Sequence, residues 1–213
     1  MLRSTLIAIS GPSGAGKTTL SNHLANALGS SATTILPVDA YYHDHSSVPP
    51  EARLTINYDS PEAIDITMLE AHLRHLQAGH SIARPQYDYR THQRLDDTII
   101  VTPERYVVIE GLMALYWPIL RSLYDMTVFV TIPDEMALER RIIRDTTERA
   151  RTEMFVRKQW QETVWPMYEK YVKPVRILAD IVIDGTAAVE TSVATLLATI
   201  NEKDSPATSN EAQ

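Results

Sequence analysis

The stretch of sequence that decides the fold is GPSGAGKTT, residues 11–19. It follows a short apolar run, LIAI at residues 6–9, and leads into residues 17–28, whose apolar side chains recur at helical spacing. A continuous apolar run of this kind is typical of a strand buried on both faces of a parallel sheet. Three of the seven glycines of the chain lie in residues 11–19. The predicted order is therefore strand, glycine-rich loop, helix.

The loop matches the P-loop pattern, in which Gly11 and Gly16 flank four residues and are followed by Lys17 and Thr18. Glycines let backbone N–H groups approach a phosphate and adopt conformations that are costly for other residues. The following helix adds the positive end of its dipole. A glycine-rich turn that matches by chance is the alternative, and the strand and helix on either side argue against it. The predicted nucleotide-binding residues are Gly11, Pro12, Ser13, Gly14, Ala15, Gly16, Lys17, Thr18 and Thr19.

Within this loop, two side chains have specific predicted roles. Lys17 is expected to reach the β- and γ-phosphates and so to act in catalysis, and Thr18 is expected to place its hydroxyl on Mg²⁺. The motif therefore predicts an ATP or GTP site and does not indicate the reaction.

The rest of the chain predicts an α/β fold. Further strands are expected at residues 34–38, 106–109, 127–130 and 179–183. Strands that alternate with helices predict a parallel sheet with right-handed crossovers. Two short extended pieces, residues 81–84 and 98–101, flank a polar segment and predict a hairpin-like excursion over the carboxyl edge of the sheet. The expected class is a P-loop NTPase-type parallel sheet flanked by helices, with a small β-hairpin excursion and a helical lid.

A single domain is expected for a chain of 213 residues. The predicted bounds are residues 1–201 for the P-loop domain, 81–102 for the hairpin on the substrate side, about 140–160 for the lid and 202–213 for a polar, disordered tail.

Composition excludes several classes of protein. The net charge of -7 gives no overall attraction for nucleic acid or for a membrane surface, so a phosphate site must be local. The absence of cysteine excludes disulfides, thiolate metal sites and cysteine nucleophiles. No apolar segment approaches the length of a membrane span. We therefore expect a soluble cytoplasmic protein with neither a nucleic-acid nor a membrane partner.

Two acidic residues follow predicted strands. Asp39 ends the second strand candidate and Glu110 ends the run VVIE, so both are expected at the carboxyl edge of the sheet, where open α/β sheets bind ligands. One carboxylate near a γ-phosphate can accept a proton from an attacking hydroxyl, and another can hold the metal. The alternative is that either residue is only a strand-end cap or a solvated acid.

The segment RRIIRDTTERAR, residues 140–151, carries several arginines. Arg141 and Arg144 share a helix face by their spacing, and Arg149 and Arg151 follow where the helix is expected to break. Guanidinium groups on a mobile segment suit a lid that closes on a transferring phosphate. Because the same segment also contains acidic residues, a solvated helix with intrahelical ion pairs is the competing interpretation.

Together these segments resemble the uridine kinase (uridine–cytidine kinase) family of P-loop kinases, in the wider group that includes phosphoribulokinase. The resemblance runs from about residue 7 to residue 185. It is carried by GPSGAGKTT, VDAYYHD, NYDSPEAID, RPQYDYRTHQR, VVIEGLMALY, RRIIRDTTERAR and VWPMYEKYVKP, which follow the order of the family at similar spacing.

The resemblance implies transfer of the γ-phosphate of ATP or GTP to the 5′-hydroxyl of uridine or cytidine. It implies that Asp39 is the general base and that Thr18, with Asp39 and Glu110 nearby, holds Mg²⁺. Arg144 and Arg149 would serve the phosphates. It also suggests a homo-oligomer, either a dimer or a tetramer.

The same resemblance assigns nine residues to the nucleoside. Ribose hydroxyls would be bound by Asp59, Arg141 and Gln159; the pyrimidine edge would be met by Tyr87 and His92, with Arg151 close to it; and the pocket wall would be Tyr42, Tyr58 and Tyr89. His92 by itself would more often be an ordinary surface histidine, and it is the surrounding motif that favours a role in binding.

The chain departs from the family pattern at four places. After Phe129 an acid-rich turn is common in the family, whereas this chain reads VTIPDE. The family often has Asp-His-Pro where this chain has Ser60 in the middle, and Glu-Arg-Gly-Arg where it has Ala150. Near the end, IVIDGTAA, with Asp184, replaces a Pro-containing Gly/Asn-rich turn. These changes leave the phosphate-binding residues intact and concern the acceptor and the lid.

Two other functions stay open. A kinase of the same group could act on another small hydroxyl acceptor, such as a sugar phosphate, glycerate, pantothenate or nicotinamide riboside. The segment with Tyr87 and His92 argues for the nucleoside. A nucleotide-binding regulator that has lost catalysis is the third reading, and the combination of Lys17, Thr18, Asp39 and Glu110 argues against it.

Overall fold

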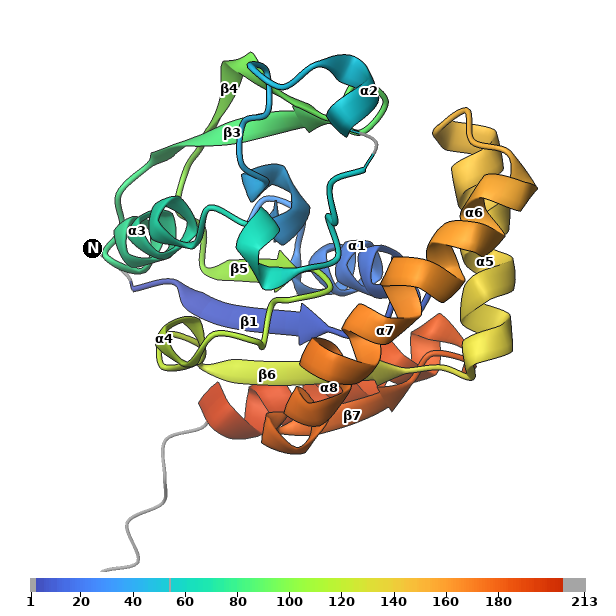
Figure 1. Cartoon of the computed structure of the whole chain (residues 1–213). Helices are drawn as coiled ribbons and strands as arrows, with labels where there is room; N and C mark the ends of the chain where they lie inside the picture. The colour runs from blue at the N-terminus through green and yellow to red at the C-terminus, as the bar shows by residue number, and fades with distance from the viewer. Residues whose placement is uncertain (1–2, 54, 205–213) are drawn as a thin grey trace, which may run out of the picture.

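A five-stranded parallel sheet forms the centre of the molecule (Figure 1). The computed structural model describes residues 3–53 and 55–204. In spatial order the strands are β2 (Thr33–Pro37), β5 (Tyr106–Glu110), β1 (Thr5–Ser10), β6 (Met126–Thr131) and β7 (Ile181–Asp184). The predicted α/β class with a parallel sheet is confirmed.

Strand β1 lies at the centre of the sheet and is buried on both faces. Ile7 and Ile9 pack on one side, in a core cluster with α1 and α8, whereas Leu6 packs on the other side in the cluster that contains α3. All three side chains are fully buried. The continuous apolar run in the sequence is thus explained, since neither face of this strand meets water.

Helices cover both faces of the sheet. They are α1 (Lys17–Leu28), α2 (Pro50–Arg53), α3 (Ile66–Gln77), α4 (Pro118–Arg121), α5 (Asp134–Glu148), α6 (Glu153–Gln159), α7 (Trp165–Met167) and α8 (Val189–Asp204). In Figure 1 the arrowheads of β1 and β6 point toward the side on which α5 and α6 stand. The carboxyl ends of the strands therefore face the segment in which the sequence predicts a lid.

The hairpin is longer than the two short extended pieces predicted from the sequence. Strands β3 (Ile82–Asp88) and β4 (Gln93–Val101) pair antiparallel as a separate two-stranded sheet. Most of the polar segment between the predicted pieces is itself strand, with a turn at residues 89–92, because only part of a half-buried strand has to be apolar. Ile82 and Tyr87 supply that part by packing into the α3 cluster.

Two further boundaries differ from the predictions. Strand β2 ends at Pro37, so Val38 starts the short 3-10 turn η1 (Val38–Tyr41) instead of ending the strand. Helix α8 extends to Asp204, so the first residues of the predicted disordered tail, 202–204, are helical. The remainder of that tail, residues 205–213, lies outside the described residues.

Over the described residues, none of the helices has both the length and the apolar character needed to cross a lipid bilayer.

The packing between α1, the sheet and α8 gives a stability prediction. Leu24 is fully buried in that cluster, so Leu24→Ala should lower the free energy of unfolding by about 2–5 kcal/mol through lost contacts and a cavity. Leu178, which is 48% exposed, is a matched control whose replacement by alanine should cost less than about 0.5 kcal/mol. If urea unfolding showed that the two variants lose equal free energy of unfolding, the predicted core would be contradicted.

Candidate active site

A cavity of about 690 Å³ lies at the carboxyl edge of the sheet. Its walls come from the P-loop, the ends of β2 and β5, the hairpin, α5 and α6. Almost all of the side chains singled out in the sequence line it. The exceptions are Gly11, Pro12 and Ala15, of which Ala15 lines a second, neighbouring cavity. Tyr58 and Asp59 also line the cavity, so residues from separate parts of the sequence meet in one place.

The P-loop is held tightly against α5. A Cβ on Gly14 would lie 2.3 Å from the carbonyl oxygen of Ala137, and Gly14 has a φ of 83°, in the region that favours glycine. Lys17 Nζ donates a hydrogen bond of 2.9 Å to the carbonyl of Pro12. Ser13, Gly14, Gly16, Lys17, Thr18 and Thr19 all line the cavity. The loop thus presents its backbone and Lys17 to the cavity in the way that the motif predicts.

The two predicted acids lie on this cavity with Thr18. Thr18 Oγ1 donates to Glu110 Oε1 at 3.1 Å, and Asp39, carried by η1, lines the same cavity. Burial raises the pKa of Glu110, and the positive charge of Lys17 opposes that shift. Burial likewise lowers the pKa of Lys17, which Glu110 and Asp39 oppose. Two carboxylates and a hydroxyl suit Mg²⁺, which takes its remaining ligands from water and phosphates.

Strand β4 braces the turn that carries Asp39. Arg94 Nη2 donates to the carbonyl of Tyr42 at 2.7 Å, and Arg94 Nη1 lies 3.5 Å from Asp65 Oδ2. Arg94 is the last residue of the motif RPQYDYRTHQR, which by itself indicates no role for it. Its contacts fix the position of η1 relative to the hairpin.

One buried carboxylate organises the arginines of α5 and the turn after it. Asp145 is fully buried, and its oxygens lie 3.6 Å from Arg141 Nε, 2.8 Å from Arg144 Nη2, 3.5 Å from Arg149 Nη1 and 3.0 Å from Arg151 Nη1. Burial acts to raise the pKa of Asp145, but the surrounding guanidinium groups outweigh it and hold the pKa below its ordinary value. The acid is therefore held in its charged form.

These four arginines also line the cavity. The two interpretations of the segment, arginines that face a phosphate and arginines in intrahelical ion pairs, are therefore compatible. The ion pairs within the segment exist, but the carboxylate that they share is fully buried, and Arg144, the most exposed of the four arginines, has a side chain that is 32% exposed. Arg141 Nη1 donates to Ser13 Oγ at 2.9 Å, and Arg144 Nη2 lies 3.5 Å from the same oxygen. The arginine cluster thus contacts the P-loop directly.

The nucleoside residues implied by the resemblance lie at the other end of the cavity. Asp59 is buried there, and burial raises its pKa while the charge of Arg141 opposes that shift. Gln159 Oε1 accepts from Arg141 Nη2 at 2.8 Å and from Arg151 Nη1 at 3.2 Å. A carboxylate, an amide and two guanidinium groups therefore share one corner.

Aromatic side chains form the wall beside this corner. Tyr42 lies 5.4 Å from Tyr58 and 5.1 Å from Tyr87 between ring centroids, and Tyr58 stacks on His92 at 4.5 Å with an interplanar angle of 18°. Arg149 lies over the ring of Tyr89 at 4.8 Å. Flat rings arranged in this way suit a planar ligand group.

His92 is held as a neutral imidazole. Its Nε2 lies 3.4 Å from Arg151 Nη2, and because a guanidinium can only donate, Nε2 must accept and Nδ1 must carry the proton. Burial lowers the pKa of His92 to about 4, and the charges of Arg151 and Arg149 add to this. No side chain of the described residues bonds to Nδ1.

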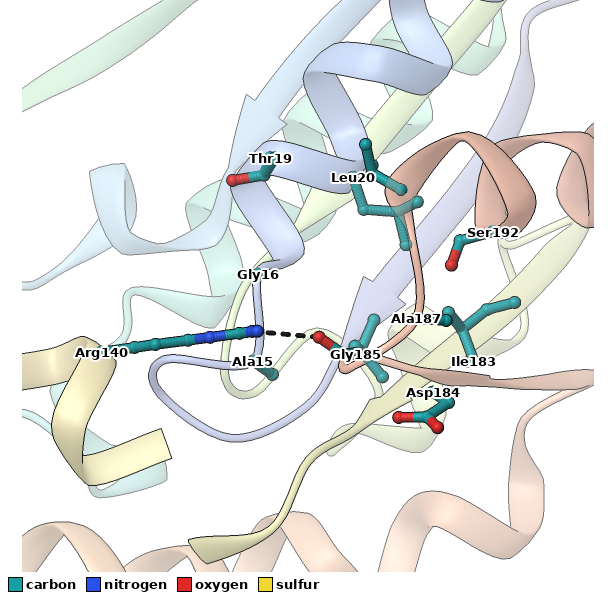
Figure 2. A pocket seen from close by; sticks show the side chains of 12 residues that line it. Ala15, Gly16, Thr19, Leu20, Arg140, Ile183, Asp184, Gly185, Ala187 and Ser192 are labelled. Carbon is teal, nitrogen blue, oxygen red and sulfur yellow. Dashed lines mark hydrogen bonds between the residues drawn. The ribbon is translucent and has the colours of Figure 1, made fainter. Parts of the chain in front are cut away.

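A second cavity of about 270 Å³ lies on the far side of the P-loop (Figure 2). The turn after β7 and the start of α8 close it, with Gly185 packed so tightly that a Cβ there would lie 2.6 Å from the carbonyl oxygen of Ala15. The two cavities share Gly16, Thr19 and Arg140. They are therefore adjacent compartments on either side of one loop.

The sequence pattern of the Phosphoribulokinase / Uridine kinase family matches residues 6–192. The chain belongs to this family. Uridine kinase from Clostridium perfringens (strain ATCC 13124) is 35% identical over 202 residues, which are 95% of this chain and 97% of that protein. Uridine kinase from Shewanella amazonensis is 38% identical over 182 residues, covering 84% of this chain and 86% of that one. The resemblance predicted from the motifs is confirmed.

A solved structure of low sequence identity shares the fold. Phosphoribulokinase from Rhodobacter spheroides superposes with a TM-score of 0.65 at 16% identity, over 85% of this chain and 70% of that one. At this level of identity the likeness supports the fold alone.

The family motifs did not lead to every residue on the cavity. Ile35, Pro37, Gly111 and Leu112 line it beside the two acidic strand ends, and their position next to Asp39 and Glu110 is the signal that could have found them. Arg140 and Glu148 also line it from α5. Asp145 is one of the acidic residues of the segment 140–151, and its spacing of four residues from both Arg141 and Arg149 permits an intrahelical pair with each.

Replacing the organising acid should destabilise the arginine cluster. Asp145→Asn keeps the shape of the side chain and leaves four guanidinium groups without their counter-charge, so unfolding free energy should fall by about 3–5 kcal/mol. The control is Glu153→Gln, which breaks an exposed pair with Arg157 and should cost less than about 1 kcal/mol. Similar small losses in both variants, measured by denaturant unfolding, would show that the Asp145 pairs contribute little.

The neutral state of His92 predicts a pH dependence. Its ordinary pKa is 6.5 and its pKa in the folded protein is about 4, so in this range the unfolded chain binds a proton that the folded protein does not. Above pH 6.5 His92 is neutral in both states and the difference in its pKa does not affect stability. As the pH falls toward 4, protonation of His92 in the unfolded chain lowers the free energy of unfolding by about 1–3 kcal/mol. His92→Asn tolerates the left-handed backbone there, where φ is 55°, and should lose less stability between about pH 7 and about pH 4.5 than the unmodified protein. Parallel pH profiles for the two proteins would contradict the assignment.

Proposed function

We propose that the protein transfers the γ-phosphate of ATP to the 5′-hydroxyl of uridine or cytidine, as a nucleoside kinase of pyrimidine salvage. The observation that carries the proposal is the single cavity in which the P-loop, Asp39, the arginine cluster and an aromatic, histidine-containing corner meet. The relatives from Clostridium perfringens and Shewanella amazonensis, both named uridine kinase, support the same acceptor.

The nucleotide would occupy both cavities. Its β- and γ-phosphates would lie on the P-loop, close to Lys17, and its base would lie in the second cavity beside Gly185. Thr18 and Glu110, with Asp39 nearby, would hold Mg²⁺, which supplies positive charge to the phosphates when it is bound.

The nucleoside would lie with its sugar against Asp59 and its base against the aromatic wall. A carboxylate pairs well with two adjacent hydroxyls, and Arg141 and Gln159 offer donors and acceptors on the same side. His92, held neutral with its proton on Nδ1, would offer a donor to the pyrimidine edge, and Tyr87 would lie beside it. Because Asp59 and His92 are both buried, little water competes with the nucleoside for these contacts.

Asp39 would take the proton from the 5′-hydroxyl as that oxygen attacks the γ-phosphorus. The new oxygen–phosphorus bond forms as the bond from the β-phosphate oxygen to the γ-phosphorus breaks, and ADP leaves. Lys17, Arg144 and Arg149 would offset the charge on the transferring group. Because Asp145 fixes the arginines beforehand, they need little reorganisation during the reaction.

The other functions open in the sequence have less support. A sugar phosphate, glycerate or pantothenate has no planar ring to place against Tyr87 and the stacked pair of Tyr58 and His92. Nicotinamide riboside does have one, so the acceptor panel below has to separate it from uridine. A regulator without catalysis would not require a carboxylate at the position of Asp39. The sequence leaves the choice between ATP and GTP open, and the expected homo-oligomer, a dimer or a tetramer, stays a prediction.

The proposal is tested by ADP release with Mg-ATP and a panel of acceptors: uridine, cytidine, ribulose 5-phosphate, glycerate, pantothenate and nicotinamide riboside. We expect turnover with uridine and cytidine alone. Asp39→Asn should lower that turnover by about 10²–10⁴-fold and leave the affinity for ATP within about threefold, because only the proton acceptor is lost. Turnover with another acceptor would refute the nucleoside assignment, and full activity of Asp39→Asn would refute the base.

A further inference from the structure

One arginine of α5 differs from its neighbours in its electrostatic surroundings. The arginines of α5, α6 and the turn between them are Arg140, Arg141, Arg144, Arg149, Arg151 and Arg157. Four of them pair with Asp145, and Arg157 pairs with Glu153 at 2.7 Å. Within residues 3–53 and 55–204, Arg140 has no carboxylate oxygen within the 4.0 Å limit of an ion pair. Its charge is thus not offset by a direct partner in this part of the chain.

Arg140 also occupies a special place between the two cavities. It lines both of them, and its Nη1 donates to the carbonyl oxygen of Gly185 at 3.0 Å, as Figure 2 shows. The side chain reaches from α5 across the P-loop, where its Nη1 lies 3.8 Å from the position that a Cβ on Gly16 would take. An arginine has five N–H donors, so most of them remain for a ligand.

We propose that Arg140 binds the nucleotide where its sugar joins the α-phosphate, and that its bond to Gly185 couples the position of α5 to the base compartment. This inference rests on the nucleotide placement in the proposed function. It adds a residue that neither the P-loop motif nor the family motifs had assigned.

The geometry leaves few other residues for this position. A nucleotide with its base in one cavity and its phosphates in the other must cross between them at Gly16, Thr19 and Arg140. Of these three, Arg140 alone is charged. The α-phosphate is the anionic group nearest the sugar, so it would supply the counter-charge that Arg140 lacks.

Gly185 fixes the other end of this connection. Its N–H donates to the carbonyl of Thr131 at 2.7 Å, which ties the turn to the end of β6. The bond from Arg140 to the Gly185 carbonyl therefore joins α5 to a turn that the sheet already holds. A shift of α5 would move a nucleotide-binding charge and the wall of the base compartment together.

The test compares affinities measured by calorimetry for Mg-ADP and for inorganic pyrophosphate. Arg140→Ala should weaken Mg-ADP binding by about tenfold or more, because a charge-assisted contact is lost. Pyrophosphate, which lacks the sugar, should lose clearly less affinity when it binds on the P-loop. The KM for uridine should stay within about twofold, since Asp59 and His92 lie in the other corner of the cavity.

Two further variants sharpen the result. Arg140→Gln keeps a donor for Gly185 without the charge, and it should lose Mg-ADP affinity like Arg140→Ala even if the alanine variant folds poorly. Arg157→Ala removes an exposed arginine from α6 and should bind Mg-ADP like the unmodified protein. Unchanged Mg-ADP affinity in the Arg140 variants would overturn the proposal. So would an equal loss for pyrophosphate, or an equal loss in Arg157→Ala.

Failure of this inference differs from failure of the proposed function. Mg-ADP binding needs no acceptor, so loss of affinity in the Arg140 variants stands even if uridine is not phosphorylated. Conversely, uridine turnover with unchanged Mg-ADP affinity in those variants would leave the kinase assignment intact and overturn the role of Arg140.

Discussion

The buried carboxylate of Asp145 is the interaction on which the rest of the site depends. Four like charges from Arg141, Arg144, Arg149 and Arg151 would repel one another at these separations without it. The backbone follows the same residue, since the N–H groups of Arg149 and Arg151 both donate to the Asp145 carbonyl. One residue therefore sets both the path of the turn after α5 and the directions of its cations.

The second constraint is close packing around the P-loop. At Gly14 and Gly185 a single added carbon would collide with backbone carbonyl oxygens, so α5 and the turn after β7 approach the loop from two sides. The loop becomes a partition between two cavities, with its N–H groups and Lys17 available to phosphates. Glycine is required there by its neighbours as well as by its own conformation.

The opposing charges divide the site into two regions. Near the P-loop, cations outnumber acids and suit a polyphosphate, whereas the corner expected for a nucleoside combines the carboxylate of Asp59 and the neutral His92 with the aromatic wall. The same arginines contact both regions, because Arg141 bonds to Ser13 and to Gln159. Binding of the two substrates is thereby connected through side chains that Asp145 already holds.

The sequence alone determined the fold class and most of the site. The P-loop can be predicted from the sequence because its function depends on the backbone conformation of consecutive residues. Asp39 and Glu110 could be placed near it because parallel strands bring their carboxyl ends to one edge of the sheet. Only the tertiary structure decided that Asp145 is the shared partner of four arginines, and that Arg140 stands between two cavities. Burial and contacts between distant segments set these features, and no local spacing encodes the removal of a charge from water.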